Sequence, residues 1–489
     1  MSSIARAGID STVRIVKSDR RQTNEWLPPA LLWLVTAILI VAHQGAVLTL
    51  AFPVLSIAVG FWLYFASPVR YVGYVWWLWF LSPEVRRLAD WSIGMYTPTS
   101  LIQVAPLAVT IISGLSLIRF YHLLAQRRGL PVLLVLAGLG YAFVIGVVSS
   151  GPMAALYDFA NWVYPILIGF HIMAYSRQYP HFRGTIINTF IWGMLLMGGY
   201  GFVQFCVMPP WDVLWMANSQ MNSLGDSVPF GVRVFSTMNS SGPFAFVMMG
   251  ALAYVIEASS RIRWVAGTLG FLSFCLSLVR SAWGGWVIAI LIQLVLSNNK
   301  LRVRIASTFL VLSFVLLPLM MIGSTADRME IRLQTLINLS DDQSYAARND
   351  FYTSFARTAF TDLTGEGLGA TGTSTKLSND RGHLGQYGNF DSGLMNIPFV
   401  LGWPGTLLYI SGLIWLLTGA AFKSRRLPGD RFVSANISIA VALVGMLLFT
   451  NSVVGTSGLM FYGSIFLILA AEPMKRQYHR TNSATRGRR

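Results

Sequence analysis

The sequence predicts an all-α polytopic integral membrane protein, with about fourteen transmembrane helices and one long periplasmic loop. Three observations predict this fold class. Apolar segments of about 20 residues, each able to cross a hydrocarbon core of roughly 30 Å as a helix, recur along the whole chain. Only 11% of the 489 residues are charged, whereas about 25% is usual in soluble proteins. Lys and Arg residues gather in every other short connection, which places them on one side, as in the cytoplasmic loops of membrane proteins.

The chain divides into five segments. Residues 1–26 are polar and basic and predict a cytoplasmic arm, because no short apolar core with a cleavage site is present. Residues 27–322 are expected to hold the first eleven helices, 323–391 the periplasmic loop, 392–471 the last three helices, and 472–489 a basic cytoplasmic tail. The expected crossings are residues 28–42, 47–65, 71–81, 98–118, 130–148, 157–175, 185–207, 236–256, 264–278, 282–296, 303–322, 393–417, 432–450 and 457–471.

The pair Arg86–Arg87 is the chief exception to this topology. The short aromatic segment Tyr71–Leu81 leads outward, so the two arginines fall in a short loop on the outer side, where Lys and Arg are rare. Either these arginines have a task at that surface, or the aromatic segment does not cross the membrane.

Composition and motifs exclude several functions. The net charge of +16 is explained by basic loops that orient the helices, so no nucleic-acid partner is expected. Two cysteines, Cys206 and Cys275, lie in apolar segments and rule out a disulfide framework or a cysteine-based zinc site. No phosphate-binding GxxxxGK[ST] loop and no HExxH motif is present. Asp158 is the clearest charge within an apolar segment, and such scarcity disfavours an ion-coupled transporter.

Three arginines on the expected outer side are the candidate binding residues: Arg233, Arg280 and Arg348. Guanidinium groups bind phosphate bidentately and stay charged, so two or three of them together would suit a lipid-linked pyrophosphate. Arg280 is expected at the tip of a tight hairpin, where Gly or Asn is commoner. The alternative is that each arginine merely extends from a helix end to the lipid headgroups.

These residues carry a resemblance to a known family. RVFSTMNSSGPFAF (233–246), SLVRSAWGGWVIAI (277–290), ARNDFYTSFARTAF (347–360), GEGLGATG (365–372) and DSGLMNIPFVLGWPG (391–405) follow one another in this order. The chain thereby resembles the O-antigen ligase and O-antigen polymerase superfamily over roughly residues 230–410. The resemblance implies a C-type glycosyltransferase fold, an inverting reaction without metal or cofactor, and a pyrophosphate site at Arg233, Arg280 and Arg348.

The general base is the point at which this chain departs from the ligase pattern. Counting back from Gly405 and Gly402 puts Asp391 and Ser392 where the ligases have a His-Asn pair. A carboxylate can also take a proton from an acceptor hydroxyl, and His383 could serve instead. Asp391 could equally be the N-cap of the following helix, and His383 a solvated loop residue.

The missing His-Asn pair favours a polymerase. The expected activity joins repeat units linked to undecaprenyl pyrophosphate into an exopolysaccharide or O-antigen at the periplasmic face of the bacterial inner membrane. Tyr345, Tyr352, Tyr387 and Phe390 are candidates for stacking on sugars. Besides the lipid-linked donor and acceptor and the membrane lipids, the resemblance suggests a flippase and a chain-length regulator as partners. The alternatives are a ligase that moves finished glycan to another acceptor and, from another class, a flippase or exporter of lipid-linked sugar.

Overall fold

The protein is described by a computed structural model. It covers residues 25–219, 222–297, 299, 302–308, 310, 363–378, 385, 387–388 and 392–472. Three of the expected site residues, Arg348, His383 and Asp391, lie outside these ranges, as do Tyr345, Tyr352 and Phe390.

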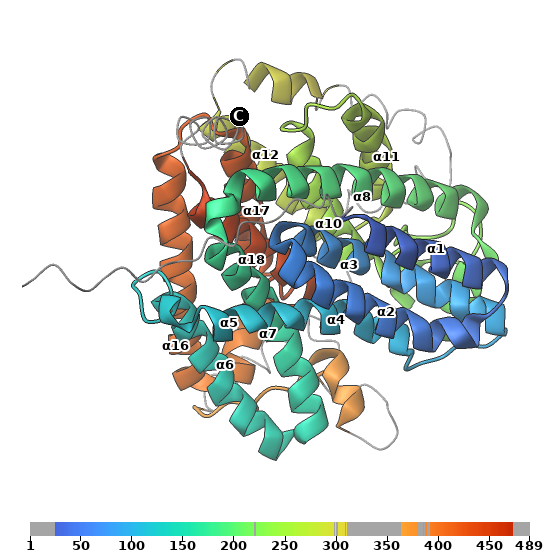
Figure 1. The fold of residues 1–489 in the computed structure, drawn as a ribbon, viewed down its shortest axis with the longest axis horizontal. Helices are drawn as coiled ribbons and strands as arrows, with labels where there is room; N and C mark the ends of the chain where they lie inside the picture. The colour runs from blue at the N-terminus through green and yellow to red at the C-terminus, as the bar shows by residue number, and fades with distance from the viewer. Residues whose placement is uncertain are drawn as a thin grey trace, which may run out of the picture.

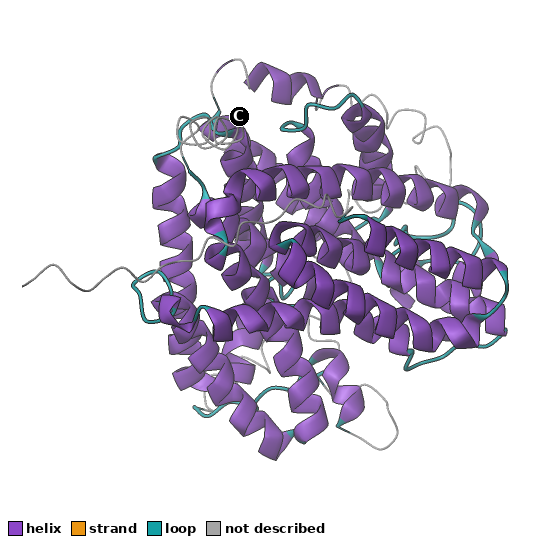
Figure 2. Cartoon of the chain, in the orientation of Figure 1, coloured by secondary structure: helices purple, strands orange, loops and turns teal. Residues whose placement is uncertain are grey.

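The described chain is helical, which confirms the all-α prediction (Figures 1 and 2). The α-helices are α1 (Leu27–Val41), α2 (Gly45–Ala66), α3 (Pro68–Ile93), α4 (Val104–Ile111), α5 (Leu115–Arg119), α6 (Leu130–Ser149), α7 (Pro152–Ala174), α8 (Tyr179–Val207), α9 (Pro210–Ser219), α10 (Ser241–Val255), α11 (Ile262–Leu276), α12 (Arg280–Leu296), α16 (Gly393–Arg425), α17 (Arg431–Met446) and α18 (Gly455–Ala470). The most extensively packed pairs are α6 with α16, α7 with α18, α8 with α11, and α12 with α17.

Length and composition suit a membrane. Five helical stretches of the described chain are long and apolar enough to span one, and six further apolar helices have 10–17 residues. The five are Gly45–Ala66, Leu101–Arg119, Leu130–Ser149, Ser176–Val207 and Gly393–Arg425. Large apolar side chains point outward from α1 and α2, with Ile38 56% and Val54 66% exposed. Exposed apolar side chains of this kind are stable where lipid replaces water.

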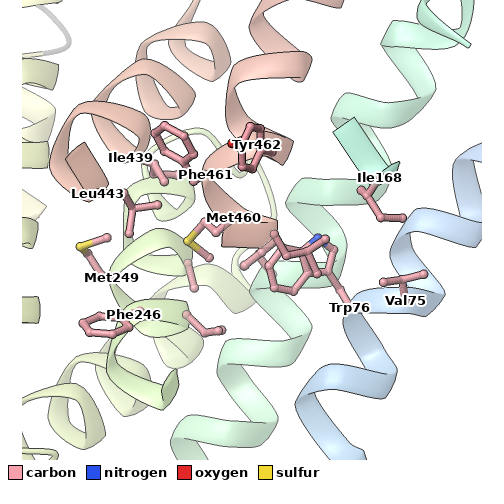
Figure 3. Packing of buried hydrophobic residues seen from close by; sticks show 14 of the residues in the cluster. Val75, Trp76, Ile168, Phe246, Met249, Ile439, Leu443, Met460, Phe461 and Tyr462 are labelled. Carbon is pink, nitrogen blue, oxygen red and sulfur yellow. The ribbon is translucent and has the colours of Figure 1, made fainter. Parts of the chain in front are cut away.

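The core joins helices that are distant in the sequence. Figure 3 shows Trp76 of α3 and Ile168 of α7 on one side of this packing, and Met249 of α10, Leu443 of α17 and Met460 of α18 on the other. All of these side chains are buried. The N-terminal and C-terminal parts of the chain therefore form one packed unit.

The prediction of a loop around Arg86–Arg87 is wrong. α3 continues without a break from Pro68 to Ile93, so the aromatic segment and both arginines belong to one helix of 26 residues. Pro83 lies inside this helix. Arg86 and Arg87 are buried, with 3% and 0% of their surfaces exposed. The local sequence reads as a loop because four charged residues follow one another closely, whereas in the folded chain these charges are paired.

The glycine-rich segment 363–372 is docked between helices. The amides of Glu366 and Gly367 donate to the carbonyls of Phe399 and Val400 in α16, at 2.9 and 3.1 Å. The amide of Leu368 donates to Ala142 of α6 at 3.0 Å. These bonds need an opening in α16, which Gly402 supplies with φ +59° and ψ 178°. The segment is therefore part of the packed helix bundle.

Glycines also set the distance between α6 and α16. A Cβ added at Gly138 would meet the carbonyl of Gly405 at 2.6 Å, and one at Gly412 would meet the carbonyl of Pro131 at 2.6 Å. A Cβ at Gly146 would overlap the backbone of Leu368. Such close backbone approach is how helices associate in lipid.

Gly146→Ala is expected to destabilise the protein by about 1–3 kcal/mol, because the new methyl group forces the docked segment away from α6. The measurement is thermal unfolding of the purified protein in detergent. Gly140→Ala on the same helix is the matched control, since nothing lies within 4 Å of its added Cβ. We expect the control to be neutral or slightly stabilising. Equal effects of the two substitutions would show that the glycine-rich segment is not held at Gly146.

Candidate functional site

Arg233 lies in the loop between α9 and α10. This loop folds back on itself at an antiparallel bridge between Gly225 and Val232. The amide of Arg233 donates to the carbonyl of Leu224 at 2.8 Å. The backbone of Arg233 is therefore fixed next to a turn at the end of the helix bundle.

The side chain of Arg233 connects this loop to the α11–α12 connection. Its guanidinium donates to the carbonyls of Ser223 at 2.7 Å, Ser277 at 3.3 Å and Leu278 at 3.1 Å. Ser277 and Leu278 directly precede Val279 and Arg280. The structure thus places the guanidinium of Arg233 next to the connection that leads into Arg280.

Arg280 is the first residue of α12 and is half-buried. The tip of the hairpin is therefore Ser277–Val279. Arg280, which was expected at the tip, follows it as the first residue of α12. Leu278 in this tip has φ +54°. This backbone conformation is unfavourable for any residue other than glycine. A cation at a helix N-terminus is also unfavourable, because the helix dipole is positive there. An anion bound at this point would interact favourably with the guanidinium of Arg280 and with the positive end of the helix dipole.

The beginning of α16 lies at the same end of the bundle as Arg280. α12 and α17 run antiparallel, since Gln293 donates to Ser438 at 3.1 Å and Gly285, one turn after Arg280, lies against Met446. Just beyond Met446, the carbonyl of Leu447 accepts from the amide of Leu394, at 3.0 Å. The described residues that follow position 391 thus lie at the end where α12 begins.

Tyr387 is the one expected sugar-stacking residue within the described chain. Its ring packs edge-on against Phe399 of α16, with 5.0 Å between the ring centroids, and it is half-buried. Its carbonyl accepts from the amide of Gly372 at 3.2 Å. Tyr387 therefore helps to hold the glycine-rich segment on α16.

A buried ionic network lies behind Arg233 and was not predicted. Arg87 of α3 pairs with Glu84 on its own helix and with Asp212 of α9, whose carboxylate lies 3.2 Å from Nε. The guanidinium also donates to the carbonyls of Ser236 and Met238, the latter at 3.2 Å. Arg87 thereby binds the backbone of the segment that begins at Arg233.

Gln204 of α8 completes this network. Its amide nitrogen donates to Asp212 at 2.7 Å, and its amide oxygen accepts from the backbone amides of Phe235 at 3.1 Å and Ser236 at 2.8 Å. Ser236 has φ +52°. Charged and amide groups thus hold Ser236 in a strained conformation three positions after Arg233. The only sequence signal for this arrangement was the unusual position of Arg86–Arg87.

A second polar cluster anchors the glycine-rich segment. The carboxylate of Asp158 in α7 accepts from the amide of Gly369 at 2.9 Å, and Asn396 of α16 donates to Thr371 at 3.1 Å. Asp158 is 8% exposed. The isolated charge noted in the sequence is thus explained by a backbone partner from a distant segment.

Within the described part of the chain, no group of three or more His, Cys, Asp or Glu side chains could hold a metal ion. The sequence matches no protein-family model, and a search of curated proteins gives no significant match.

Proposed function

We propose that the protein is an inverting polysaccharide polymerase that uses a donor linked to a polyprenyl pyrophosphate. The growing chain on its carrier is the donor, and an incoming lipid-linked repeat unit is the acceptor. An acceptor hydroxyl oxygen attacks the anomeric carbon, the bond from that carbon to the pyrophosphate oxygen breaks, and the hydroxyl proton passes to a base of the protein. The carrier pyrophosphate leaves with the electron pair.

One observation carries this proposal: Arg233 binds the backbone that leads directly into Arg280. Two guanidinium groups at the beginning of a helix suit a pyrophosphate, because each can make charge-assisted hydrogen bonds to phosphate oxygens. In the reaction, these groups stabilise the charge that develops on the leaving group. The resemblance of residues 233–246 and 277–290 to the polymerase and ligase superfamily supports the same assignment.

The remaining roles extend the proposal to residues outside the described chain. Arg348 is the third pyrophosphate ligand, and Asp391 or His383 takes the acceptor proton. The described helix α16 begins two residues after Asp391, at the end of the bundle where α12 begins. We assign this end to the periplasmic face of the inner membrane, because Lys and Arg of the short loops gather at the other end.

The proposal is tested by the size distribution of carrier-linked and released glycan in cells that lack the protein, resolved by gel electrophoresis and mass spectrometry. A polymerase predicts single repeat units on the carrier at the outer face. Long chains stranded on the carrier would mean a ligase, and repeat units trapped at the inner face would mean a flippase. Either of those outcomes contradicts the proposal.

A further inference from the structure

A large cavity opens at the end of the bundle away from Arg280. It has a volume of about 1220 Å³ and lies between the C-terminal ends of α7, α16 and α18, the start of α6 and the turn that follows α5. The chain passes from α16 directly into α17, whose N-terminus is the end opposite to the beginning of α12. The cavity and the candidate pyrophosphate site are therefore at opposite ends of the molecule.

Cations from three separate connections line this cavity. Arg127 and Arg128 come from the turn before α6, Arg177 from the connection between α7 and α8, and Arg426 from the end of α16. All four are exposed. Among the described residues, none of the four lies within ion-pair distance of a carboxylate. The cavity thus presents several guanidinium groups to whatever enters it.

Nearby acidic residues do not neutralise these arginines. Glu257 and Asp430 lie at the same end but pair with Arg183, and neither lines the cavity. Glu472 follows two residues after the lining residue Ala470 but does not itself line the cavity. The last 17 residues, 473–489, contain no acidic side chain.

Apolar side chains also form part of the cavity wall. They come from the turn after α5, from α16 and from α18, namely Phe120, Trp415, Leu416, Phe422 and Leu469. Phe422 is 63% exposed. A free inorganic anion would gain nothing from this wall, whereas an amphiphile would bury its apolar part there. The volume also exceeds the roughly 300–1,000 Å³ of ordinary small-molecule sites.

We infer that this cavity binds an anionic glycerophospholipid, with its phosphate at the four arginines and its acyl chains along the aromatic and aliphatic wall. Orientation of the helices by basic loops explains why each arginine lies at this end. It does not explain why arginines from three connections converge on one cavity with an apolar wall. Basic cavities between membrane helices are suited to anionic lipid headgroups. The inference does not depend on the chemistry at the Arg280 end.

The test measures lipid binding to the purified, delipidated full-length protein by native mass spectrometry. The probes are dioleoylphosphatidylglycerol and dioleoylphosphatidylcholine, which share their acyl chains and differ in headgroup charge. We expect the anionic lipid to bind at least tenfold more tightly. The double variant Arg177→Gln, Arg426→Gln should lose about twenty-five-fold in affinity for it, because each arginine near a lipid surface contributes about fivefold.

The double variant Arg261→Gln, Arg425→Gln is the matched control. It removes the same charge from the same end of the bundle, but neither residue lines the cavity. The control should bind phosphatidylglycerol as the unmodified protein does. Equal losses in both variants would mean general attraction to surface charge, and equal binding of the two lipids would mean no headgroup selection. Thermal stabilisation by inorganic phosphate equal to that by the lipid would mean a soluble-anion site. Each of these three results would overturn the inference.

Discussion

Replacing Arg280 by alanine is expected to abolish polymer formation while the protein stays in the membrane at its normal level. The side chain supplies charge to the leaving pyrophosphate at the beginning of α12, and loss of one such group typically costs 10²–10³-fold in rate. The measurement is the glycan length distribution in cells that carry the variant, with the amount of protein determined by immunoblot. Normal polymer length would contradict the assignment of Arg280.

Two further variants sharpen this prediction. Arg280→Lys keeps the charge but cannot bind phosphate with two parallel hydrogen bonds, so we expect partial activity. Arg425→Ala removes an arginine at the end of α16, at the other end of the bundle, and should leave polymer length unchanged. If Arg425→Ala shortened the polymer as much as Arg280→Ala, the loss would reflect net charge rather than a site.

Arg87→Ala is expected to cost about 3–5 kcal/mol of folding free energy, because removing one partner of a buried ion pair leaves an uncompensated charge. The substitution leaves the buried carboxylates of Glu84 and Asp212 without their cation, and the carbonyls of Ser236 and Met238 without a donor. The measurement is thermal or denaturant unfolding of the purified protein in detergent.

Arg70→Ala is the control on the same helix. Arg70 pairs with Glu25 at 2.9 Å, but both side chains are about one-third exposed, at 35% and 29%. Exposed pairs contribute at most about 1 kcal/mol, so this variant should unfold almost as the unmodified protein does. If both variants lost a similar free energy of unfolding, the buried Arg87 network would contribute no more to stability than the exposed Arg70–Glu25 pair.

Helices were predictable where the pattern is local. The apolar segments 28–42 and 47–65 predict two successive helices, and the structure confirms them as α1 and α2. α3 was missed because its charges lie in the last three turns of the helix, where their sequence resembles a polar loop. Their burial is made possible by Asp212, which lies more than 120 positions further along the chain. The spacing of residues in a local sequence does not predict a partner at that distance.

The candidate site also contains residues that the sequence predicted and residues that it did not. Arg233 and Arg280 were proposed from residue type and motif, and the structure places the side chain of Arg233 on the carbonyls of Ser277 and Leu278, just before Arg280. Gln204 was not identified, since a single glutamine in an apolar helix carries no signal of the backbone that it binds. Asp158 was noticed as a charge, but its partner is a main-chain amide, which has no sequence signature.

The glycine contacts between α6 and α16 bear on how the protein responds to heat. Separated helices in a bilayer are solvated by acyl chains, so bringing α6 and α16 together removes little apolar surface from water. The heat-capacity change on separating them should accordingly be small, because that quantity follows the apolar area newly exposed to water. Their association then depends on dispersion forces and on competition from acyl chains. The chain length of the surrounding detergent or lipid should change the temperature at which this pair separates more than added salt does.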